Sequence, residues 1–176
     1  MNKLWAPWRM KYIKGIDKKD EGCVFCIKPQ QADDKKNFIL LRGKHSFIIL
    51  NAFPYSNGHL LIVPFLHTSE LDMLNEQVSM ELWRHILLCK NVLKKASNPD
   101  GFNIGINVGR PAGAGIDQHV HIHIVPRWNG DTNFMTVLDE TRVISEGLRD
   151  TYDSLLPFFK ELSGLVGLSK GTPGIS

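Results

Sequence analysis

The amino-acid sequence predicts an α+β protein with an antiparallel sheet of about five strands and two main helices. Short runs rich in β-branched and other apolar residues are separated by turns that contain glycine, proline and asparagine, which is typical of hairpin-linked strands. Two longer segments repeat apolar residues at helical spacing. One of these segments lies between strands and the other follows them, and this order favours the α+β class.

The strands are expected at residues 37–42, 46–50, 59–63, 102–108 and 119–127. Gly43-Lys44-His45 separates the first two runs and signals a hairpin. Residues 51–58 contain proline, serine, asparagine and glycine, so we expect a loop there. The third strand stops at Pro64.

The first helix is expected at residues 77–97, and a second at residues 143–162. The apolar stripe of the first helix is formed by Val78, Leu82, Ile86, Cys89 and Leu93. Because Cys89 lies on this stripe, it is most simply a core residue. Asn98-Pro99-Asp100-Gly101 ends the helix.

The 176 residues suit one domain with a sizeable core, and we find no internal repeat or linker in the sequence. We expect three parts: an N-terminal arm at residues 1–22, the main domain at 23–163 and a flexible tail at 164–176. The arm contains Trp5 and Trp8 close together, so it should pack on the body or on a partner chain.

Composition excludes several functional classes. A formal net charge of +3 is too small to argue for nucleic acid as a partner. No apolar run reaches transmembrane length, and the N-terminus lacks the apolar centre of a signal peptide, so we expect a cytoplasmic protein without a membrane partner. Its three cysteines should be reduced, and a close pair among them suits metal binding or redox chemistry better than a structural disulfide.

The fifth expected strand carries three histidines on one face. His119, His121 and His123 alternate with apolar residues that point into the core. A polar face open to water is one interpretation, but three of the seven histidines within five residues favour a reaction site. The row could bind one metal ion. Alternatively, one histidine could be a nucleophile or base while its neighbours set its tautomer and stabilise charge.

Two further motifs carry chemical information. The stretch Gly109–Gly115 holds three glycines and a proline, and backbone N–H groups in such loops can approach an anion closely. Its position shortly before the histidine row suggests phosphate chemistry. The pair Cys23 and Cys26 is ambiguous by itself, because a redox pair should follow a strand and a zinc site needs two more ligands.

The segment His119-Val120-His121-Ile122-His123-Ile124-Val125 resembles the signature of the histidine triad (HIT) superfamily of nucleotide hydrolases and transferases. Residues 47–51 and 58–64 resemble the two strands around the nucleoside pocket in that family. The opening residues 4–9 and residues 125–135 are similar to the bacterial branch that includes diadenosine tetraphosphate phosphorylases. The resemblance implies a HIT-like fold and a homodimer whose sheet continues across the interface.

The resemblance also implies a role for each histidine. His121 corresponds to the nucleophile, which attacks the α-phosphorus and forms a nucleotidyl-histidine intermediate. Such a nucleophile must be a neutral imidazole whose second nitrogen is held as N–H by a carbonyl oxygen. His123 would contribute charge and hydrogen bonds to the phosphate oxygens. The catalytic row is therefore His121, His123 and His119.

By the same resemblance, the nucleotide-binding residues are Asn51, Asn107, Gly113, Gly115 and Gln118. Asn51 matches the ribose position and Asn107 lies near the amide beside the phosphate, although both could be ordinary turn or strand-end residues. Many family members carry serine or threonine three residues before the first histidine, where this chain has Ile116. Gln118 and Asp117 are then candidates for contacting the leaving phosphate, with a plain surface loop as the alternative.

In the zinc-containing members of the family, a Cys-x-x-Cys pair and two histidines form one site. Here those positions are Cys23, Cys26, His67 and His119. Two thiolates and two imidazoles make a closed tetrahedral set of the structural kind. The alternative is a pair of reduced buried thiols without metal. No organic cofactor is implied.

The implied function is cleavage of a phosphoanhydride in an adenosine-containing nucleotide such as a diadenosine polyphosphate. One alternative is a hydrolase of small adenylates or nucleoside phosphoramidates. Another is a zinc-stabilised nucleotide-binding protein without turnover. Whether phosphate or water accepts the nucleotidyl group stays open. Arg127, expected close to the triad, and Arg110 in the glycine-rich loop are the expected phosphate-binding cations, or else ordinary surface charges.

Overall fold

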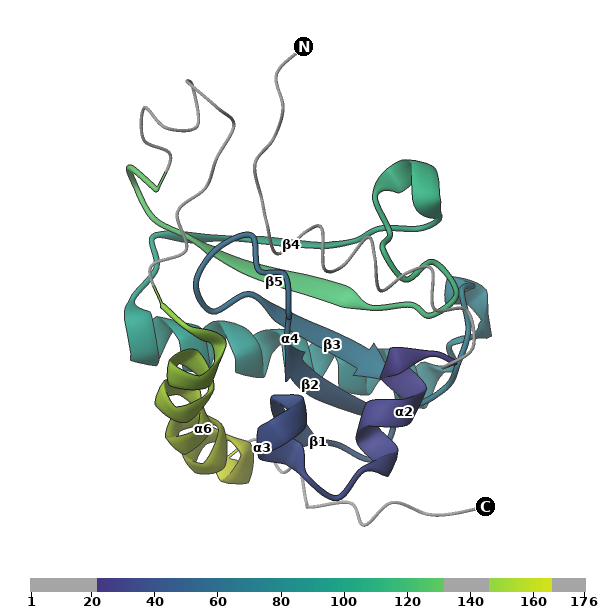
Figure 1. Cartoon of the computed structure of the whole chain (residues 1–176), viewed down its shortest axis with the longest axis horizontal. Coiled ribbons are helices and arrows are strands. Elements are labelled where there is room, and N and C mark those ends of the chain that lie inside the picture. The colour runs from purple at the N-terminus through teal and green to yellow at the C-terminus, as the bar shows by residue number, and fades with distance from the viewer. Residues whose placement is uncertain (1–21, 132–145, 166–176) are drawn as a thin grey trace.

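The computed structural model describes residues 22–131 and 146–165 (Figure 1). Its strands are β1 (Ile39–Arg42), β2 (Ser46–Leu50), β3 (Leu60–Pro64), β4 (Gly101–Ile106) and β5 (Ile122–Arg127). The helices are α2 (Val24–Gln30), α3 (Asp34–Asn37), α4 (Glu76–Ser97) and α6 (Leu148–Leu165), with 3-10 turns η1 (Leu71–Met73) and η2 (Arg110–Ala112). The five strands form one antiparallel sheet in the order β1-β2-β3-β5-β4, which confirms the predicted fold class.

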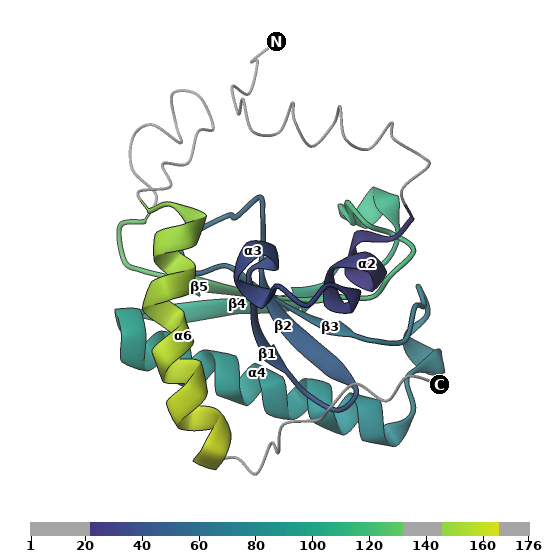
Figure 2. The same ribbon diagram turned by 60° about the horizontal axis from the view of Figure 1, so that its bottom comes forward.

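The two faces of the sheet bury different clusters. Helices α4 and α6 cover one face, and α2 lies against the other (Figure 2). The larger core joins α4 and α6 to the strands through residues such as Ile48, Leu60, Ile62, Ile124 and Phe159. The smaller cluster under α2 consists of Phe25, Ile39, Phe47, Ile49, Leu61 and Val63. Because strand side chains alternate between faces, β2 and β3 are buried on both sides.

Helix α4 forms where its apolar stripe predicts, and both of its ends are capped. The Asn75 side chain accepts a hydrogen bond from the Val78 backbone N–H at the N-terminus. At the C-terminus Asn98 adopts the left-handed conformation, which asparagine tolerates better than most residues. Cys89 is fully buried in the larger core, as expected.

A buried polar group attaches α4 to the first hairpin. The Glu81 carboxylate accepts hydrogen bonds from the backbone of Lys44 and His45 and from the Ser46 hydroxyl. Gly43 allows this approach, because an added Cβ there would lie 2.5 Å from Glu81 Oε1. The His45 carbonyl in turn accepts from the Phe65 backbone N–H. The hairpin turn thereby fixes the end of β3, from which the segment to His67 departs.

Helices α2 and α3 are not expected from the sequence, and Asn37 belongs to α3 rather than to the first strand. The Asp33 side chain caps α3 by accepting from the Lys36 backbone N–H, and this local bond competes with an extended chain. The strand with the histidine row begins later than predicted, at Ile122.

Several expected features fall at or beyond the limits of the described residues. The N-terminal arm lies outside them except for Gly22, and the start of the second helix at residues 143–145 also lies outside them. Helix α6 extends to Leu165, so the first residues of the predicted tail are helical, and residues 166–176 are outside. Within residues 22–131 and 146–165, the helices are too short or too polar to cross a membrane.

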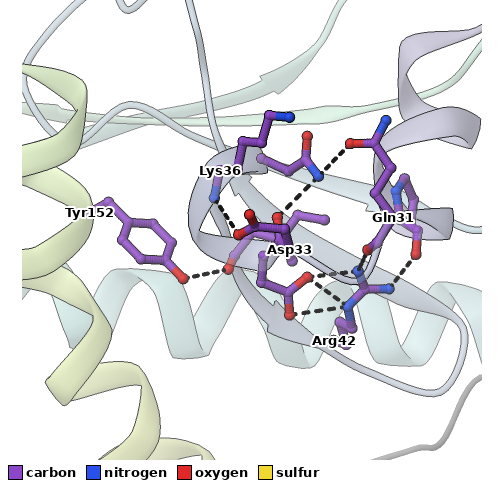
Figure 3. A network of polar contacts seen from close by, with 9 residues as sticks. Gln31, Asp33, Lys36, Arg42 and Tyr152 are labelled. Carbon is purple, nitrogen blue, oxygen red and sulfur yellow. Dashed lines mark hydrogen bonds and ion pairs between the residues drawn. The ribbon is translucent and has the colours of Figure 1, made fainter.

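Arg42 on β1 anchors the end of α2. Its guanidinium donates to the Asp34 carboxylate at 2.6 Å and to the Pro29 carbonyl at 2.7 Å. Figure 3 shows Arg42 within this network of polar contacts. The guanidinium also donates to the Gln31 carbonyl. These carbonyls at the C-terminal end of α2 would otherwise lack partners. The bidentate contact therefore holds α2 and α3 against the edge of the sheet.

Candidate functional site

The histidine row lies on the face of the sheet that α2 covers. His123 on β5 stands opposite Leu61 of β3 and Gly105 of β4. His119 and His121 are buried, at 1% and 5% exposure, and His123 is half-buried. A strand face open to water is therefore the wrong interpretation for the first two histidines. The structure brings all three residues of the predicted catalytic row together.

His121 has the protonation pattern of a nucleophile. Its Nδ1–H donates to the His119 carbonyl oxygen at 2.9 Å. Since a carbonyl only accepts, this bond places the proton on Nδ1 and leaves a lone pair on Nε2. Burial lowers the pKa of His121, and the bond to the His119 carbonyl opposes this shift in part. The imidazole is then neutral at pH 7, as an attacking nitrogen must be.

A chain of hydrogen bonds fixes the opposite tautomer on His123. The Tyr55 backbone N–H donates to His59 Nδ1 at 3.0 Å, so the proton of His59 is on Nε2. His59 Nε2–H donates to His123 Nδ1 at 3.0 Å, which leaves the proton of His123 on Nε2. Within the part of the chain that the structure describes, His123 Nε2 is buried and has no hydrogen-bond partner. It is a donor available to a ligand oxygen.

His59 and His123 act as neutral groups in this arrangement. Burial, with the neighbouring His123 and His121, lowers the pKa of His59 to about 3. Burial, with His121, lowers the pKa of His123 to about 4. The geometry thus favours the hydrogen-bonding part of the role expected for His123 over the part that needs a positive charge.

The loop between β2 and β3 forms one side of the site. The Asn51 amide nitrogen lies 3.3 Å from His59 Nδ1, and the Asn51 side-chain oxygen accepts from the Phe53 backbone N–H. The Tyr55 ring stacks on His123 with 6.0 Å between ring centroids and 12° between planes. Sequence reasoning assigned no role to His59 or Tyr55. The signal available in the sequence was the position of His59 eight residues after Asn51, at the end of a loop rich in turn residues, but this spacing does not show which ring the histidine contacts.

The glycine-rich loop follows β4. Gly109 and Gly113 have φ angles of +80° and +93°, which favour glycine. Asn107 lies beside Gly113, because its amide nitrogen would be 3.8 Å from an added Cβ there. Gly115 and Gln118 are exposed. The structure therefore joins Asn107 to the predicted phosphate-binding loop and leaves Gln118 on the surface.

The two arginines differ in position. Arg110 in the glycine-rich loop donates to the Asp117 carboxylate at 2.7 Å, and this contact lowers the pKa of Asp117. Arg127 lies at the far end of β5, six residues and thus about 20 Å beyond His121 along an extended strand. It donates to the Asp131 carboxylate and to the Asn103 side chain. The prediction that Arg127 lies close to the triad is wrong, because its place in the strand carries it away from the histidines.

Cys23, Cys26, His67 and His119 converge on one point, with ligand atoms all within 4.8 Å of one another. Cys23 Sγ is 3.3 Å from His119 Nδ1, and the Nδ1 atoms of His67 and His119 are 3.2 Å apart. Ligands bound at about 2.1–2.3 Å around a tetrahedral zinc ion lie roughly 3.4–3.8 Å from each other. The donor set and its spacing therefore fit zinc.

Two further contacts support a metal at this cluster. His119 Nε2–H donates to the Pro64 carbonyl at 2.9 Å, which leaves the Nδ1 lone pair facing the two thiols. Burial and the adjacent Cys23 raise the pKa of Cys26 to about 11. Two close thiols resist ionisation without a cation, and a bound cation would remove this penalty. Two histidines complete the Cys-x-x-Cys pair, which favours metal binding over a redox role.

Known proteins are similar to this chain in sequence and in fold. Residues 32–130 match the family model of the HIT domain. An AP-4-A phosphorylase of Mycobacterium tuberculosis is 38% identical over 157 residues, which cover 86% of this chain and 80% of the relative. A bis(5'-adenosyl)-triphosphatase of Dictyostelium discoideum is 30% identical over 133 residues, 72% of this chain and 89% of the relative. A Zn-bound histidine triad family protein from Mycobacterium smegmatis aligns with a TM-score of 0.66 at 25% identity, over 82% of this chain and 97% of that structure.

Proposed function

The chain belongs to the HIT domain family, and from this premise we propose that it is an enzyme that cleaves diadenosine polyphosphates through a nucleotidyl-histidine intermediate on His121. The observation that carries the proposal is the bond from His121 Nδ1–H to the His119 carbonyl, which leaves Nε2 as a buried, neutral nucleophile. The names of the relatives, an AP-4-A phosphorylase and a bis(5'-adenosyl)-triphosphatase, support the substrate class.

In the first step, His121 Nε2 attacks the α-phosphorus of diadenosine tetraphosphate. The Nε2–phosphorus bond forms, the bond from the α-phosphorus to its bridging oxygen breaks, and ATP leaves with both electrons of that bond. His123 Nε2–H is placed to donate to a phosphate oxygen whose charge increases in the transition state. Because His59 and Tyr55 fix its proton on the required nitrogen, no tautomer change is needed during the reaction.

In the second step, an acceptor oxygen attacks the same phosphorus and releases His121. If inorganic phosphate is the acceptor, the product is ADP; if water is the acceptor, the product is AMP. We propose phosphate, on the strength of the similarity to an AP-4-A phosphorylase. Arg110 supports this choice, since it is exposed in the glycine-rich loop and carries a charge suited to phosphate.

Inorganic phosphate should raise the rate of diadenosine tetraphosphate cleavage and give ADP together with ATP. Replacing Arg110 with alanine should raise the phosphate concentration needed for half-maximal rate by about tenfold, since one charge-assisted contact contributes roughly 1.5 kcal/mol. The measurement is product analysis by anion-exchange chromatography over a series of phosphate concentrations.

Arg127→Ala is the matched control, because this arginine pairs with Asp131 at the distant end of β5. Its phosphate dependence should equal that of the wild type. If the products are AMP and ATP at every phosphate concentration, the protein is a hydrolase. Turnover of adenosine phosphoramidate in preference to the tetraphosphate would favour the small-adenylate alternative. Binding without any product would leave only a nucleotide-binding role.

We also propose that zinc occupies the Cys23, Cys26, His67 and His119 cluster. When bound, it would act as a structural centre without an open position for a reacting water. The Zn-bound relative from Mycobacterium smegmatis supports the metal. A reducing cytoplasm, as expected from the sequence, would keep both thiols available as ligands.

A homodimer is the third proposal, with β4 of each chain at the interface. Strand β4 is one of the two edge strands of the described sheet and exposes Ile104 and Ile106. On α4, Trp83 and Leu87 are 59% and 45% exposed and lie one turn apart on the outer face. Exposed apolar groups of this size on an edge strand and a neighbouring helix are typical of an association surface.

The wild type should elute in light-scattering chromatography with about twice the chain mass of 19.9 kDa. The double variant Trp83→Glu and Ile104→Glu should elute as one chain, because two carboxylates would be buried against apolar groups. Met73→Glu is the control, as Met73 is also an exposed apolar residue, at 62%, but belongs to η1. A monomeric wild type, or a double variant that stays dimeric, contradicts the proposal.

A further inference from the structure

We propose that Phe25 is a positioning residue for His121. The metal cluster fixes the position of the Phe25 ring, and the Phe25 ring in turn sets the orientation of the His121 ring. The inference rests on the proposed function, because it concerns the orientation of the nucleophile in that reaction. Phe25 stands between the two cysteine ligands in the sequence and belongs to the first turn of α2. Metal ligands and nucleophile are thus joined by one side chain.

The Phe25 ring contacts both His119, a residue of the metal cluster, and His121, the proposed nucleophile. Its centroid is 5.1 Å from that of His121, with 52° between the planes, and 5.6 Å from that of His119 in an edge-to-face arrangement. Phe25 is only 5% exposed and belongs to the smaller core cluster, together with Phe47 and Leu61. The ring is therefore held on several sides, and His121 packs against a fixed surface.

The position of Phe25 depends on the metal cluster. Helix α2 has seven residues, and a helix of this length is not stable by itself. Its C-terminal end is anchored by Arg42, but the side chain of its N-cap residue, Cys23, makes no capping hydrogen bond. The contacts of the Cys23 and Cys26 sulfurs with His119 and His67 secure the N-terminal end. A metal bound there would fix the first turn of α2 and Phe25 with it.

Two rings adjoin that of His121: Phe25, at 5.1 Å between centroids, and His123, at 4.9 Å. Only Phe25 belongs to the helix that carries the cysteines. The His121 Nδ1–H bond to the His119 carbonyl fixes one edge of the ring, and the attacking Nε2 is on the opposite edge. A bond at one edge permits the ring to tilt about that contact, unless a neighbour packs on its face. Phe25 is such a neighbour. Since a displacement of the reacting atom by about 1 Å can cost roughly 100-fold in rate, its support should be visible in kcat.

The test compares Phe25→Leu with Phe47→Leu. Both replace a buried phenylalanine of the same cluster, but the ring neighbour of Phe47 is Phe65 rather than a histidine. Phe25→Leu should keep the metal content and KM of the wild type while kcat falls about tenfold or more. Phe47→Leu should lose a similar amount of thermal stability and keep kcat within about twofold. Equal kcat values in the two variants would overturn the proposal.

A second experiment tests the link to the metal without relying on turnover. Zinc is exchanged for the larger cadmium ion in the wild type and in Phe25→Leu, and the His121 ring resonances are recorded by NMR. The exchange should shift these resonances in the wild type and shift them clearly less in the variant. Equal shifts in both proteins would overturn the proposal. Failure of the proposed function has a different signature, because the wild type itself would then form no nucleotidyl-His121.

Discussion

Replacing His121 with asparagine should reduce cleavage of diadenosine tetraphosphate by roughly 10⁴- to 10⁶-fold, the loss seen when a covalent nucleophile is removed. Asparagine is close in size to the imidazole and can still donate to the His119 carbonyl, so the surrounding packing should survive. It has no lone pair on a nitrogen that could attack phosphorus. The expected result is therefore a folded protein that binds the nucleotide and does not turn it over.

Three measurements make this prediction specific. The melting temperature and the dissociation constant for a non-cleavable diadenosine tetraphosphate analogue should stay near the wild-type values. Mass spectrometry of acid-sensitive adducts should find the nucleotidyl group on His121 in the wild type and none in the variant. His45→Asn is the control, because His45 uses only its backbone in the contacts described above and should keep full activity. A covalent nucleotide on another residue would refute the assignment.

The parts of the fold that the sequence predicts are those with a repeating pattern. Strands β2 and β3 are fully buried apolar runs between turn residues, and α4 carries a long stripe between Asn75 and Asn98. Helices α2 and α3 have seven and four residues, too few for such a repeat. They are held in part by contacts with residues distant in the sequence, such as those of Cys23 with His119 and of Lys35 with Asp153. No local pattern predicts these contacts.

The functional site, like the fold, has parts that the sequence predicts and parts that depend on tertiary contacts. The spacing of the histidine row, together with the family resemblance, predicts His121 as the nucleophile. The resemblance also predicts the four residues that converge in the metal cluster. The chain from Tyr55 through His59 to His123 depends on the pairing of β3 with β5 and on the path of one loop. The distance of Arg127 from the triad depends on how far β5 continues straight. Both the hydrogen-bonded chain and the position of Arg127 depend on tertiary structure. The sequence therefore predicts no role for Tyr55 or His59, and it places Arg127 too close to the triad.

Purification without added metal should yield about one zinc ion per chain, and Cys23→Ser should lose it. The melting temperature of this variant should fall by about 10 °C or more, because each kcal/mol lost shifts the midpoint by about 2–4 °C in a protein of this size. Helix α2 would then be held at its C-terminal end by Arg42 and by the small core cluster alone. Activity measured well below the transition should fall no further than in Phe25→Leu, since His121 keeps its bond to the His119 carbonyl.

Cys89→Ala separates loss of the metal from loss of a thiol. Cys89 is fully buried in the larger core, away from the cluster, so this variant should lose some stability and keep one equivalent of zinc. Calorimetry with and without a strong chelator completes the comparison, because chelation should lower the melting temperature of the wild type and of Cys89→Ala but not that of Cys23→Ser. A metal-free wild type with an unchanged melting temperature would show that the four residues form no structural metal site.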